Sequence, residues 1–206
     1  MRFMLGVDEA GRGPLAGPVA VGVVAVPDGF DVTSEFPNVR DSKLLTSQRR
    51  EELFELLDER AAQGDLRYTV QFENAEIIDM KGIVTAVERA LHRGVDALVR
   101  KECRASAEWG CTTLPEFQIL LDGLLHAPPQ YAQITIEGGD ELVPLISLAS
   151  IAAKVSRDRL MNQLAREYPA YGFDQHKGYG TAEHYLAIRE YGPCVIHRRS
   201  FLHLIP

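Results

Sequence analysis

Two apolar runs near the start of the chain are separated by a short polar segment rich in glycine and proline. The runs are Phe3–Val7 and Val19–Val26, and the segment between them reads Asp8-Glu9-Ala10-Gly11-Arg12-Gly13-Pro14-Leu15-Ala16-Gly17-Pro18. Runs of this length and composition predict two strands, and the valine and glycine content of the second predicts burial on both of its faces. The chain is therefore expected to contain a β-sheet with this polar segment at one end of two strands.

The rest of the chain alternates between helical and strand-like patterns. Helices are predicted over about 46–63, 74–80, 83–100, 145–168 and 181–191, strands over 66–72, 117–123 and 131–136, and loops over 104–116, 126–130 and 169–180. In the helix over 83–100, the residues expected to face the core are Val84, Val87, Leu91, Val95 and Leu98. This order favours one α/β domain over residues 1–206, with helices packed on a mixed sheet.

The charge is unevenly distributed along the chain. The formal net charge of −7 by itself argues against a nucleic-acid partner. From Lys154 onward, however, eight Lys and Arg stand against five Asp and Glu, a balance of +3, which leaves −10 for the first 153 residues. A locally basic region on an acidic chain can still hold a polyanion.

The sequence also indicates a compartment. No apolar run reaches membrane-spanning length, and Met1–Gly6 leads directly into Val7 and Asp8, so we expect neither a secretory signal nor a transmembrane anchor. Cys103, Cys111 and Cys194 form no close zinc-type pair. We therefore expect free thiols in a reducing cytoplasm.

Four acids are candidates for one shared site. Adjacent Asp8 and Glu9 would face opposite sides of a regular strand, but a break at Asp8, permitted by the glycines that follow, would let Glu9 turn to the same side. Asp122 ends a strongly apolar strand, where ligands of open α/β sheets collect, and Asp140 lies between a strand and the long helix. Each of these acids would also be unremarkable as an exposed residue at a turn, so the residues alone leave both interpretations open.

Cations and aromatic residues gather in the second half of the chain. The helix around Ser147–Asp158 begins with small residues, which would let it approach the sheet closely. In this helix, Lys154 and Asp158 could form a surface pair. Alternatively, Lys154 or Arg157 lies near the acids or near a phosphate. The segment Tyr171–Thr181 combines glycine, cations and tyrosines before a helix, which suits phosphate contacts and base stacking as well as it suits a packed loop. The run His197–Ser200 offers further phosphate contacts or a solvated tail.

Several rival chemistries are excluded by their motifs. The chain has no Gly-x-x-x-x-Gly-Lys-Ser/Thr phosphate loop and no Gly-x-Ser-x-Gly elbow. Gly11-x-Gly13-x-x-x-Gly17 imitates a dinucleotide fingerprint, but a strand-like run follows it and the acidic pair before it would repel a pyrophosphate.

Five blocks of sequence, taken together, resemble the bacterial ribonuclease HII family. They are Asp8-Glu9-Ala10-Gly11-Arg12-Gly13-Pro14, Asp41-Ser42-Lys43, Leu121-Asp122-Gly123, Ala149–Asp158 and His176-Lys177-Gly178-Tyr179, and they follow the family's order over residues 3 to about 201. The resemblance implies an RNase H-like α/β fold, with a mixed central sheet flanked by helices and a substrate-binding helical segment over about 170–206. It implies a cytoplasmic, metal-dependent endonuclease that cuts the RNA strand of RNA–DNA hybrids. It also implies nicking on the 5′ side of single ribonucleotides embedded in duplex DNA, as in ribonucleotide excision repair.

The same resemblance assigns roles to particular residues. It implies that the metal-binding carboxylates are Asp8, Glu9, Asp122 and Asp140. It also implies that Gly11-Arg12-Gly13 reads the ribose 2′-hydroxyl and that Tyr179 stacks beside the RNA–DNA junction. The phosphate contacts that it implies are Lys43, Lys154, His176 and Lys177. Many relatives have Lys-Gly-Asp where this chain has Gly138-Gly139-Asp140, so Glu137 and Glu141 stay open as alternatives for the fourth ligand.

Oxygen ligands of this kind suit Mg²⁺ or Mn²⁺. Two such ions, about 4 Å apart, would activate a water and stabilise the leaving 3′-oxygen, giving 3′-hydroxyl and 5′-phosphate ends. We expect the enzyme to act as a monomer.

Overall fold

The computed structural model describes residues 1–39, 45–108 and 114–202, and its centre is a five-stranded sheet in the order β3-β2-β1-β4-β5. The strands are β1 (Arg2–Ala10), β2 (Val19–Pro27), β3 (Arg67–Glu73), β4 (Glu116–Asp122) and β5 (Ala132–Ile136). The β1–β2 and β2–β3 pairs are antiparallel, whereas β1–β4 and β4–β5 are parallel. The sheet is therefore mixed, as predicted.

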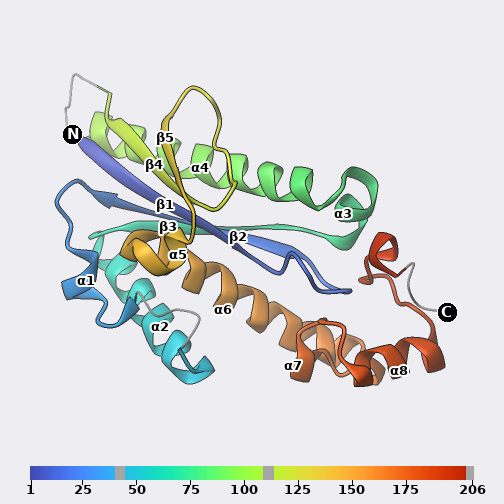
Figure 1. Cartoon of the computed structure of the whole chain (residues 1–206). Coiled ribbons are helices and arrows are strands. Elements are labelled where there is room, and N and C mark those ends of the chain that lie inside the picture. The colour runs from blue at the N-terminus through green and yellow to red at the C-terminus, as the bar shows by residue number, and fades with distance from the viewer. Residues whose placement is uncertain (40–44, 109–113, 203–206) are drawn as a thin grey trace.

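Helices surround this sheet and connect its strands (Figure 1). They are α1 (Val32–Glu35), α2 (Ser47–Gln63), α3 (Ala75–Lys81), α4 (Ile83–Glu108), α5 (Gly139–Leu142), α6 (Pro144–Glu167), η2 (Pro169–Tyr171), α7 (Phe173–His176), α8 (Ala182–Tyr191) and η3 (Arg199–Phe201). The helix starts predicted at Thr46, Asn74 and Thr181 are confirmed as N-caps, because each side chain accepts a hydrogen bond from a backbone N–H of the first turn.

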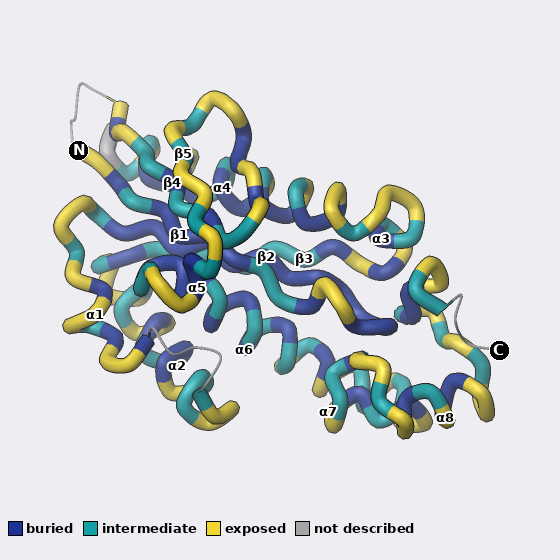
Figure 2. Tube along the Cα trace, viewed as in Figure 1, coloured by how far each residue is buried: buried dark blue, intermediate teal, exposed yellow. Residues whose placement is uncertain are grey.

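The sheet lies between two helical layers, with α4 on one face and α6 on the other (Figure 1). Side chains of β2 alternate between two cores: Val21 and Val23 pack with α4, while Val24 and Val26 pack with α6 and α2. This alternation confirms the predicted burial of β2 on both faces, and Figure 2 shows β1 and β2 as a largely buried pair.

Helix α6 lies unusually close to the sheet. A Cβ atom on Gly22 would lie 2.2 Å from the carbonyl oxygen of Ala149, and one on Gly6 would lie 2.4 Å from that of Leu145. The small residues at the start of α6 therefore do what the sequence predicted, since they let the helix backbone rest on two strand glycines.

Two details of α4 differ from the sequence prediction. The helix continues to Glu108, so that part of the loop expected over 104–116 is helical. Val84 is 56% exposed, although it was expected to face the core with Val87 and Leu91. Its neighbour Ile83 packs against the core instead.

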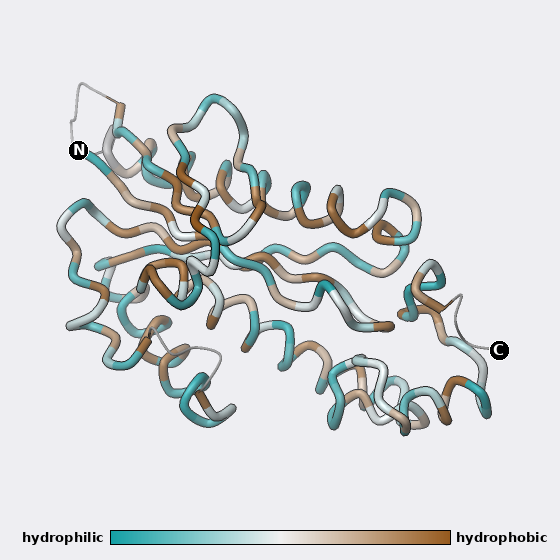
Figure 3. Tube along the Cα trace, in the orientation of Figure 1, coloured by the Kyte–Doolittle hydropathy of each residue, from teal (hydrophilic) through white to brown (hydrophobic). Residues whose placement is uncertain are grey.

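The segment from η2 to α8 packs on the C-terminal half of α6, whereas η3 packs on α3. Met161 of α6 joins Tyr171, Phe173 and Ala187 in a small separate core, to which the β1–β2 turn contributes Ala16. Figure 3 shows apolar and polar residues alternating along α6 up to this region. The segment predicted to bind substrate is thus attached both to α6 and to the β1–β2 turn.

Candidate active site

Strand β1 carries the first two candidate acids without interruption. Its pairing with β2 runs on through Asp8↔Gly22 and Glu9↔Val21 to Ala10, so the predicted break at Asp8 is wrong. The continuous antiparallel ladder holds the backbone in place, and the chain turns only at Gly11, where φ is +89°. On its other side, the pairing of β1 with β4 ends one residue before Asp8.

Asp8, Glu9 and Asp122 form one acidic cluster at this end of the sheet. Asp8 is 5% exposed. Its burial, and then the nearby charges of Glu9 and Asp122, hold the pKa of Asp8 well above its usual range, although a hydrogen bond with the Ser150 side chain acts in the opposite direction. Residues more than a hundred positions apart in the sequence thus meet, as expected from the end of the apolar strand β4.

Asp140 lies against this cluster through its backbone. Its N–H donates to Oδ1 of Asp122 at 3.2 Å, and its carbonyl accepts a hydrogen bond of 2.6 Å from the Ser147 hydroxyl. Asp140 is buried, whereas Glu137 and Glu141, the alternative fourth ligands, are exposed. The ligand role of Asp140 remains a prediction.

Gly138 has a conformational reason to be glycine. It precedes α5 with φ +65°, in the left-handed region that favours glycine. Another residue type at this position would therefore adopt a strained backbone conformation.

The donor chemistry of the cluster fits a hard divalent cation. Across the described part of the chain, no three or more His, Cys, Asp or Glu side chains form a group that could hold a metal ion as they are placed. However, Oε2 of Glu9 is buried with no hydrogen-bond partner among the described residues, while Oε1 accepts from Arg12 at 2.9 Å. A buried acceptor left without a partner costs about 1–3 kcal/mol, and clustered carboxylates repel one another. A cation bound by carboxylate oxygens would relieve both penalties.

The turn that follows the acids contains two glycines with different surroundings. A Cβ atom on Gly11 would lie 2.0 Å from Nε of Arg157, so this position requires glycine. A Cβ atom on Gly13 would meet no described atom within 4 Å. Gly11 is therefore needed by the fold, whereas the space beside Gly13 is open to a ligand.

The loop that contains Tyr179 lies directly against this turn. The carbonyl of Gly178 accepts hydrogen bonds from the backbone N–H groups of Leu15 at 2.8 Å and Ala16 at 3.3 Å. Tyr179 itself is 44% exposed, and the guanidinium of Arg157 lies 5.8 Å from the centre of its ring. The structure thus brings together two segments from opposite ends of the chain that were both predicted to contact substrate.

His176 uses both ring nitrogens within the protein. Nε2 donates to the carbonyl of Tyr171 at 2.7 Å, and Nδ1 accepts from the N–H of Gly178 at 3.2 Å, which fixes the tautomer. Its ring stacks on that of His184, with centres 4.4 Å apart. These contacts hold the loop in shape, and the predicted phosphate contact of His176 stays a prediction.

The predicted phosphate-binding lysines are placed differently from one another. Lys154 pairs with Asp158 at 3.2 Å, which is the surface pair that the spacing allowed. Lys177 donates from Nζ to the carbonyl of Asp174. Lys43 lies outside the described residues.

Two arginines were misjudged from the sequence. Arg157 and Arg198 are 1% and 0% exposed, and they bond to backbone carbonyls instead of facing phosphate or solvent. Arg157 stands between Ser156 and Asp158, and Arg198 stands between His197 and Arg199, so their sequence neighbours give no sign of burial or of a distant carbonyl partner.

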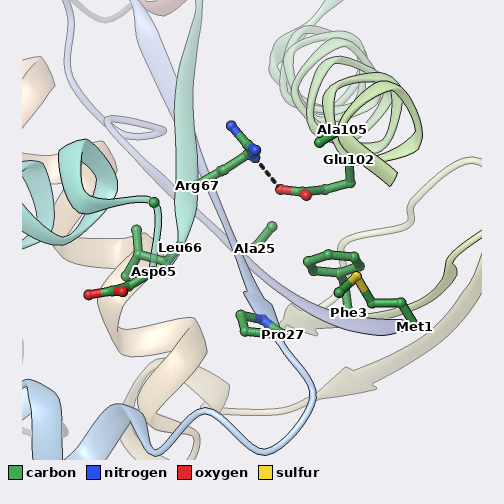
Figure 4. A pocket seen from close by; sticks show the side chains of 10 residues that line it. Met1, Phe3, Ala25, Pro27, Asp65, Leu66, Arg67, Glu102 and Ala105 are labelled. Atoms are coloured by element: carbon green, nitrogen blue, oxygen red, sulfur yellow. Dashed lines mark ion pairs between the residues drawn. The ribbon is translucent and has the colours of Figure 1, made fainter. Parts of the chain in front are cut away.

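A cavity of about 160 Å³ lies elsewhere, between the start of β1, the start of β3 and the end of α4 (Figure 4). Apolar residues such as Phe3 and Leu66 line it, and Arg67 and Glu102 form an ion pair of 2.6 Å beside it. None of the predicted site residues borders this cavity.

The structure describes two of the three cysteines, and its helices can be compared with the length that a membrane span needs. Cys103 and Cys194 are free thiols, as expected, and Cys111 lies outside the described residues. No helix in the described ranges is both long and apolar enough to cross a membrane.

Comparison with known proteins agrees with the sequence resemblance. The family model for ribonuclease HII matches residues 5–204. Curated ribonuclease HII proteins from Geobacter sulfurreducens and from Burkholderia mallei are 42% and 43% identical to this chain over 200 and 199 residues. Each alignment covers 97% of this chain, and 82% and 83% of those relatives.

Solved structures show the same fold. Ribonuclease H2 from Pyrococcus horikoshii OT3 superposes with a TM-score of 0.69 at 25% identity, covering 96% of this chain and 93% of that one. A chain in the PCNA:RNase HII complex from Archaeoglobus fulgidus gives a TM-score of 0.69 at 24% identity, covering 98% and 94%. The predicted RNase H-like fold is confirmed. The chain belongs to the ribonuclease HII family of divalent-metal-dependent endonucleases, which cut the RNA strand of RNA–DNA hybrids.

Proposed function

We propose that this enzyme also nicks duplex DNA on the 5′ side of a single embedded ribonucleotide, leaving 3′-hydroxyl and 5′-phosphate ends. The observation that carries the proposal is the hydrogen bond of 2.8 Å from Leu15 N–H to the Gly178 carbonyl. It fixes the turn around Gly13 beside the exposed ring of Tyr179, and the same turn begins at Gly11, just after the end of β1, the strand that carries Asp8 and Glu9. A sugar contact, a stacking ring and the acidic cluster are therefore available to one nucleotide step.

The acidic cluster holds the metal in this proposal. Asp8, Glu9, Asp122 and Asp140 would bind Mg²⁺ or Mn²⁺ through carboxylate oxygens. When bound, such ions supply an activated water and stabilise charge on the leaving 3′-oxygen. Because water and not the neighbouring 2′-hydroxyl attacks the phosphorus, the products carry the proposed ends. Arg12, which pairs with Glu9, orients that carboxylate at the edge of the cluster.

The turn and the Tyr179 loop recognise the substrate. The open space beside Gly13 lets a ribose approach the backbone of Gly11-Arg12-Gly13 closely enough for its 2′-hydroxyl to be read. The exposed ring of Tyr179 stacks at the junction between RNA and DNA. Lys43, Lys154, His176 and Lys177 contact phosphates, and the bonds of His176 to Tyr171 and Gly178 also hold the loop that carries Lys177.

This activity suits an enzyme that begins the removal of ribonucleotides from DNA. We accordingly place it in the cytoplasm, acting as a monomer in ribonucleotide excision repair. Residues 1–206 act as one catalytic unit, in which the segment that begins near residue 170 packs on α6 through Tyr171, Phe173 and Ala187 and forms part of the substrate-binding surface.

The test uses three labelled duplexes of equal length with Mg²⁺ or Mn²⁺: one with a single ribonucleotide, one entirely of DNA, and one RNA–DNA hybrid. We expect one cut 5′ of the ribonucleotide, none in the DNA duplex, and multiple cuts in the hybrid. A polymerase should extend the upstream product, as a 3′-hydroxyl requires. An intact single-ribonucleotide duplex under conditions where the hybrid is cut would refute the proposal.

Variants assign the roles within the same assay. Asp8→Asn and Asp122→Asn should abolish cutting of both substrates, and full activity in either variant would contradict the assigned site. Tyr179→Ala should reduce cutting at the single ribonucleotide more than cutting of the hybrid, and equal losses would contradict the stacking role. Tyr191→Ala is the matched control, since Tyr191 is also an exposed tyrosine but lies at the end of α8.

A further inference from the structure

Arg157 and Arg198 are two buried cations beneath the β1–β2 turn that the site described above does not use. They are 1% and 0% exposed, and neither forms an ion pair with a carboxylate among the described residues. Their charges lie near enough to oppose each other. Asp158 lies near enough to favour the charge of Arg157, and Asp79 lies near enough to favour that of Arg198. Burying two like charges side by side still costs stability, and apolar residues of similar size would avoid that cost. Their retention therefore suggests that the two guanidinium groups have a role that apolar side chains at these positions could not fulfil.

Arg198, which follows α8 in the C-terminal part of the chain, forms hydrogen bonds to the β1–β2 turn. Its Nη2 donates to the carbonyl of Gly11 at 2.7 Å, its Nη1 to that of Arg12 at 2.9 Å, and its Nε to that of Gly17 at 2.9 Å. The planar, rigid guanidinium thus fixes three points of one short turn. Two of these points belong to the residues proposed to read the ribose.

Arg157 joins the same turn to the Tyr179 loop. Its Nε donates to the carbonyl of Pro18 at 2.9 Å, and its Nη2 donates to those of Ala16 at 3.3 Å and Lys177 at 3.0 Å. The guanidinium also lies 5.8 Å from the centre of the Tyr179 ring. One side chain therefore touches both the turn and the support of the stacking ring.

We propose that Arg157 and Arg198 are positioning residues for recognition of a single ribonucleotide: they hold the sugar-reading turn and Tyr179 at a fixed spacing, so that the ribose and the junction are recognised together. The inference rests on the proposed function. A single ribonucleotide offers one productive register, in which both elements must engage at once. A long hybrid offers a ribose at every step of the RNA strand, so it tolerates a change in that spacing.

Lysine substitutions distinguish the contribution of the guanidinium's several hydrogen-bond donors from that of its positive charge. Arg198→Lys and Arg157→Lys keep a cation but lose the several donors of the guanidinium. We expect kcat/KM for the single-ribonucleotide duplex to fall about tenfold more than kcat/KM for the hybrid, since misplacing a positioned group is costly. Equal losses on both substrates would mean a merely structural role and would overturn the inference. If the native enzyme cuts the hybrid but not the single ribonucleotide, the proposed function itself has failed.

A double-mutant cycle tests the route through the tyrosine. If Arg157 acts by placing Tyr179, Arg157→Lys should add little to the selective loss already caused by Tyr179→Ala. Fully additive losses would contradict that route.

Hydrogen exchange of the metal-free protein gives a second readout. Arg157→Lys should speed amide exchange in both 11–18 and 176–179. Faster exchange in only one of these segments would refute the coupling.

A milder pair of variants covers the case in which a buried lysine prevents folding. Asp79 of α3 accepts hydrogen bonds from the N–H groups of Arg199 at 2.8 Å and Ser200 at 2.9 Å, and so anchors the segment that carries Arg198. Asp79→Asn should show the same selective loss to a smaller degree. Asp31→Asn is the matched control, because Asp31 makes equivalent bonds at the start of α1, far from the turn. Identical selectivity in Asp79→Asn, Asp31→Asn and native protein would overturn the inference.

Discussion

Leu15 and Gly178 are joined by a backbone hydrogen bond of 2.8 Å that connects the first turn of the chain to one of its last loops. The approach is tight, because a Cβ atom on Gly178 would lie 2.4 Å from the carbonyl oxygen of Ala16, and φ at Gly178 is +85°. The proposed substrate surface is therefore a joint between two distant segments, and its parts can be tested separately.

Gly13→Ala should impair activity without affecting stability. No described atom lies within 4 Å of the added methyl group, so the unfolding free energy should stay within about 0.5 kcal/mol of native. The methyl group would occupy the space proposed for the ribose, and kcat/KM should fall about 10- to 100-fold. Urea unfolding and the cleavage assay check both halves, and full activity of this variant would contradict the assignment.

Gly11→Ala should instead destabilise the protein. The new methyl group would need φ near +89° and would collide with the buried Arg157 side chain, at a cost of about 1–3 kcal/mol. Urea unfolding of Gly11→Ala and Gly13→Ala side by side compares their free energies of unfolding. A variant as stable as native protein would show that the turn relaxes more easily than its contacts indicate.

Asp8→Asn should stabilise the metal-free protein while abolishing activity. Burial and the charges of Glu9 and Asp122 raise the pKa of Asp8, so the ionised form at pH 7 is unfavourable in the folded state and its removal should contribute about 1–3 kcal/mol. In linkage terms, Asp8 favours folding at low pH, and this contribution is lost as pH rises through its elevated pKa. Urea unfolding in EDTA checks this prediction, and a less stable variant would contradict it.

The same acids should also control the response to metal. Mn²⁺ should raise the melting temperature of native protein and leave that of Asp8→Asn unchanged, because only a folded site binds the ion. Glu137→Gln and Glu141→Gln serve as controls and should keep the native response if Asp140 is the fourth ligand. A response lost in either control would move that role away from Asp140.

Acid should destabilise the fold through two buried histidines. Burial lowers the pKa of both His184 and His197 to about 4 in the folded state, and their Nε2 atoms lie 3.1 Å apart. The unfolded chain takes up these protons near pH 6.5, so the unfolding free energy should fall as pH drops from about 6.5 to 4, by about 3 kcal/mol for one histidine. Above that window, the contribution of the neutral histidines to stability is complete.

Urea unfolding at several pH values measures this slope. His197→Gln should flatten it, whereas the exposed His126→Gln should leave it unchanged. An unaltered slope in His197→Gln would contradict the assignment to these histidines.

Most of the framework followed from local patterns in the sequence. The apolar runs of β1 and β2 and the capping residues Thr46, Asn74 and Thr181 each act within a few residues, so a single segment carries the information. The acids of the cluster were also predictable in part, because Asp122 ends an apolar strand of the kind that places side chains at a sheet edge.

What escaped prediction depends on contacts between distant residues. The continuity of β1 through Asp8 is imposed by pairing with β2, which outweighs the glycines that follow. The roles of Arg157 and Arg198 depend on carbonyl groups more than a hundred positions away. No local pattern distinguishes a buried arginine that binds a backbone from an exposed one that binds phosphate.

The three bonds between Arg198 and the β1–β2 turn span 181, 186 and 187 residues, which has a consequence for folding. Contacts of such long range carry a large loop-closure cost and tend to form late. During synthesis, the acids proposed to bind metal and their sheet can assemble before Arg198 exists, but the turn proposed to read the ribose lacks its bonds to Arg198 until residue 198 has been added. On the proposed assignments, an incomplete chain would thus hold much of the hydrolytic machinery before it could select a sugar, and selectivity would be the last property that the protein acquires.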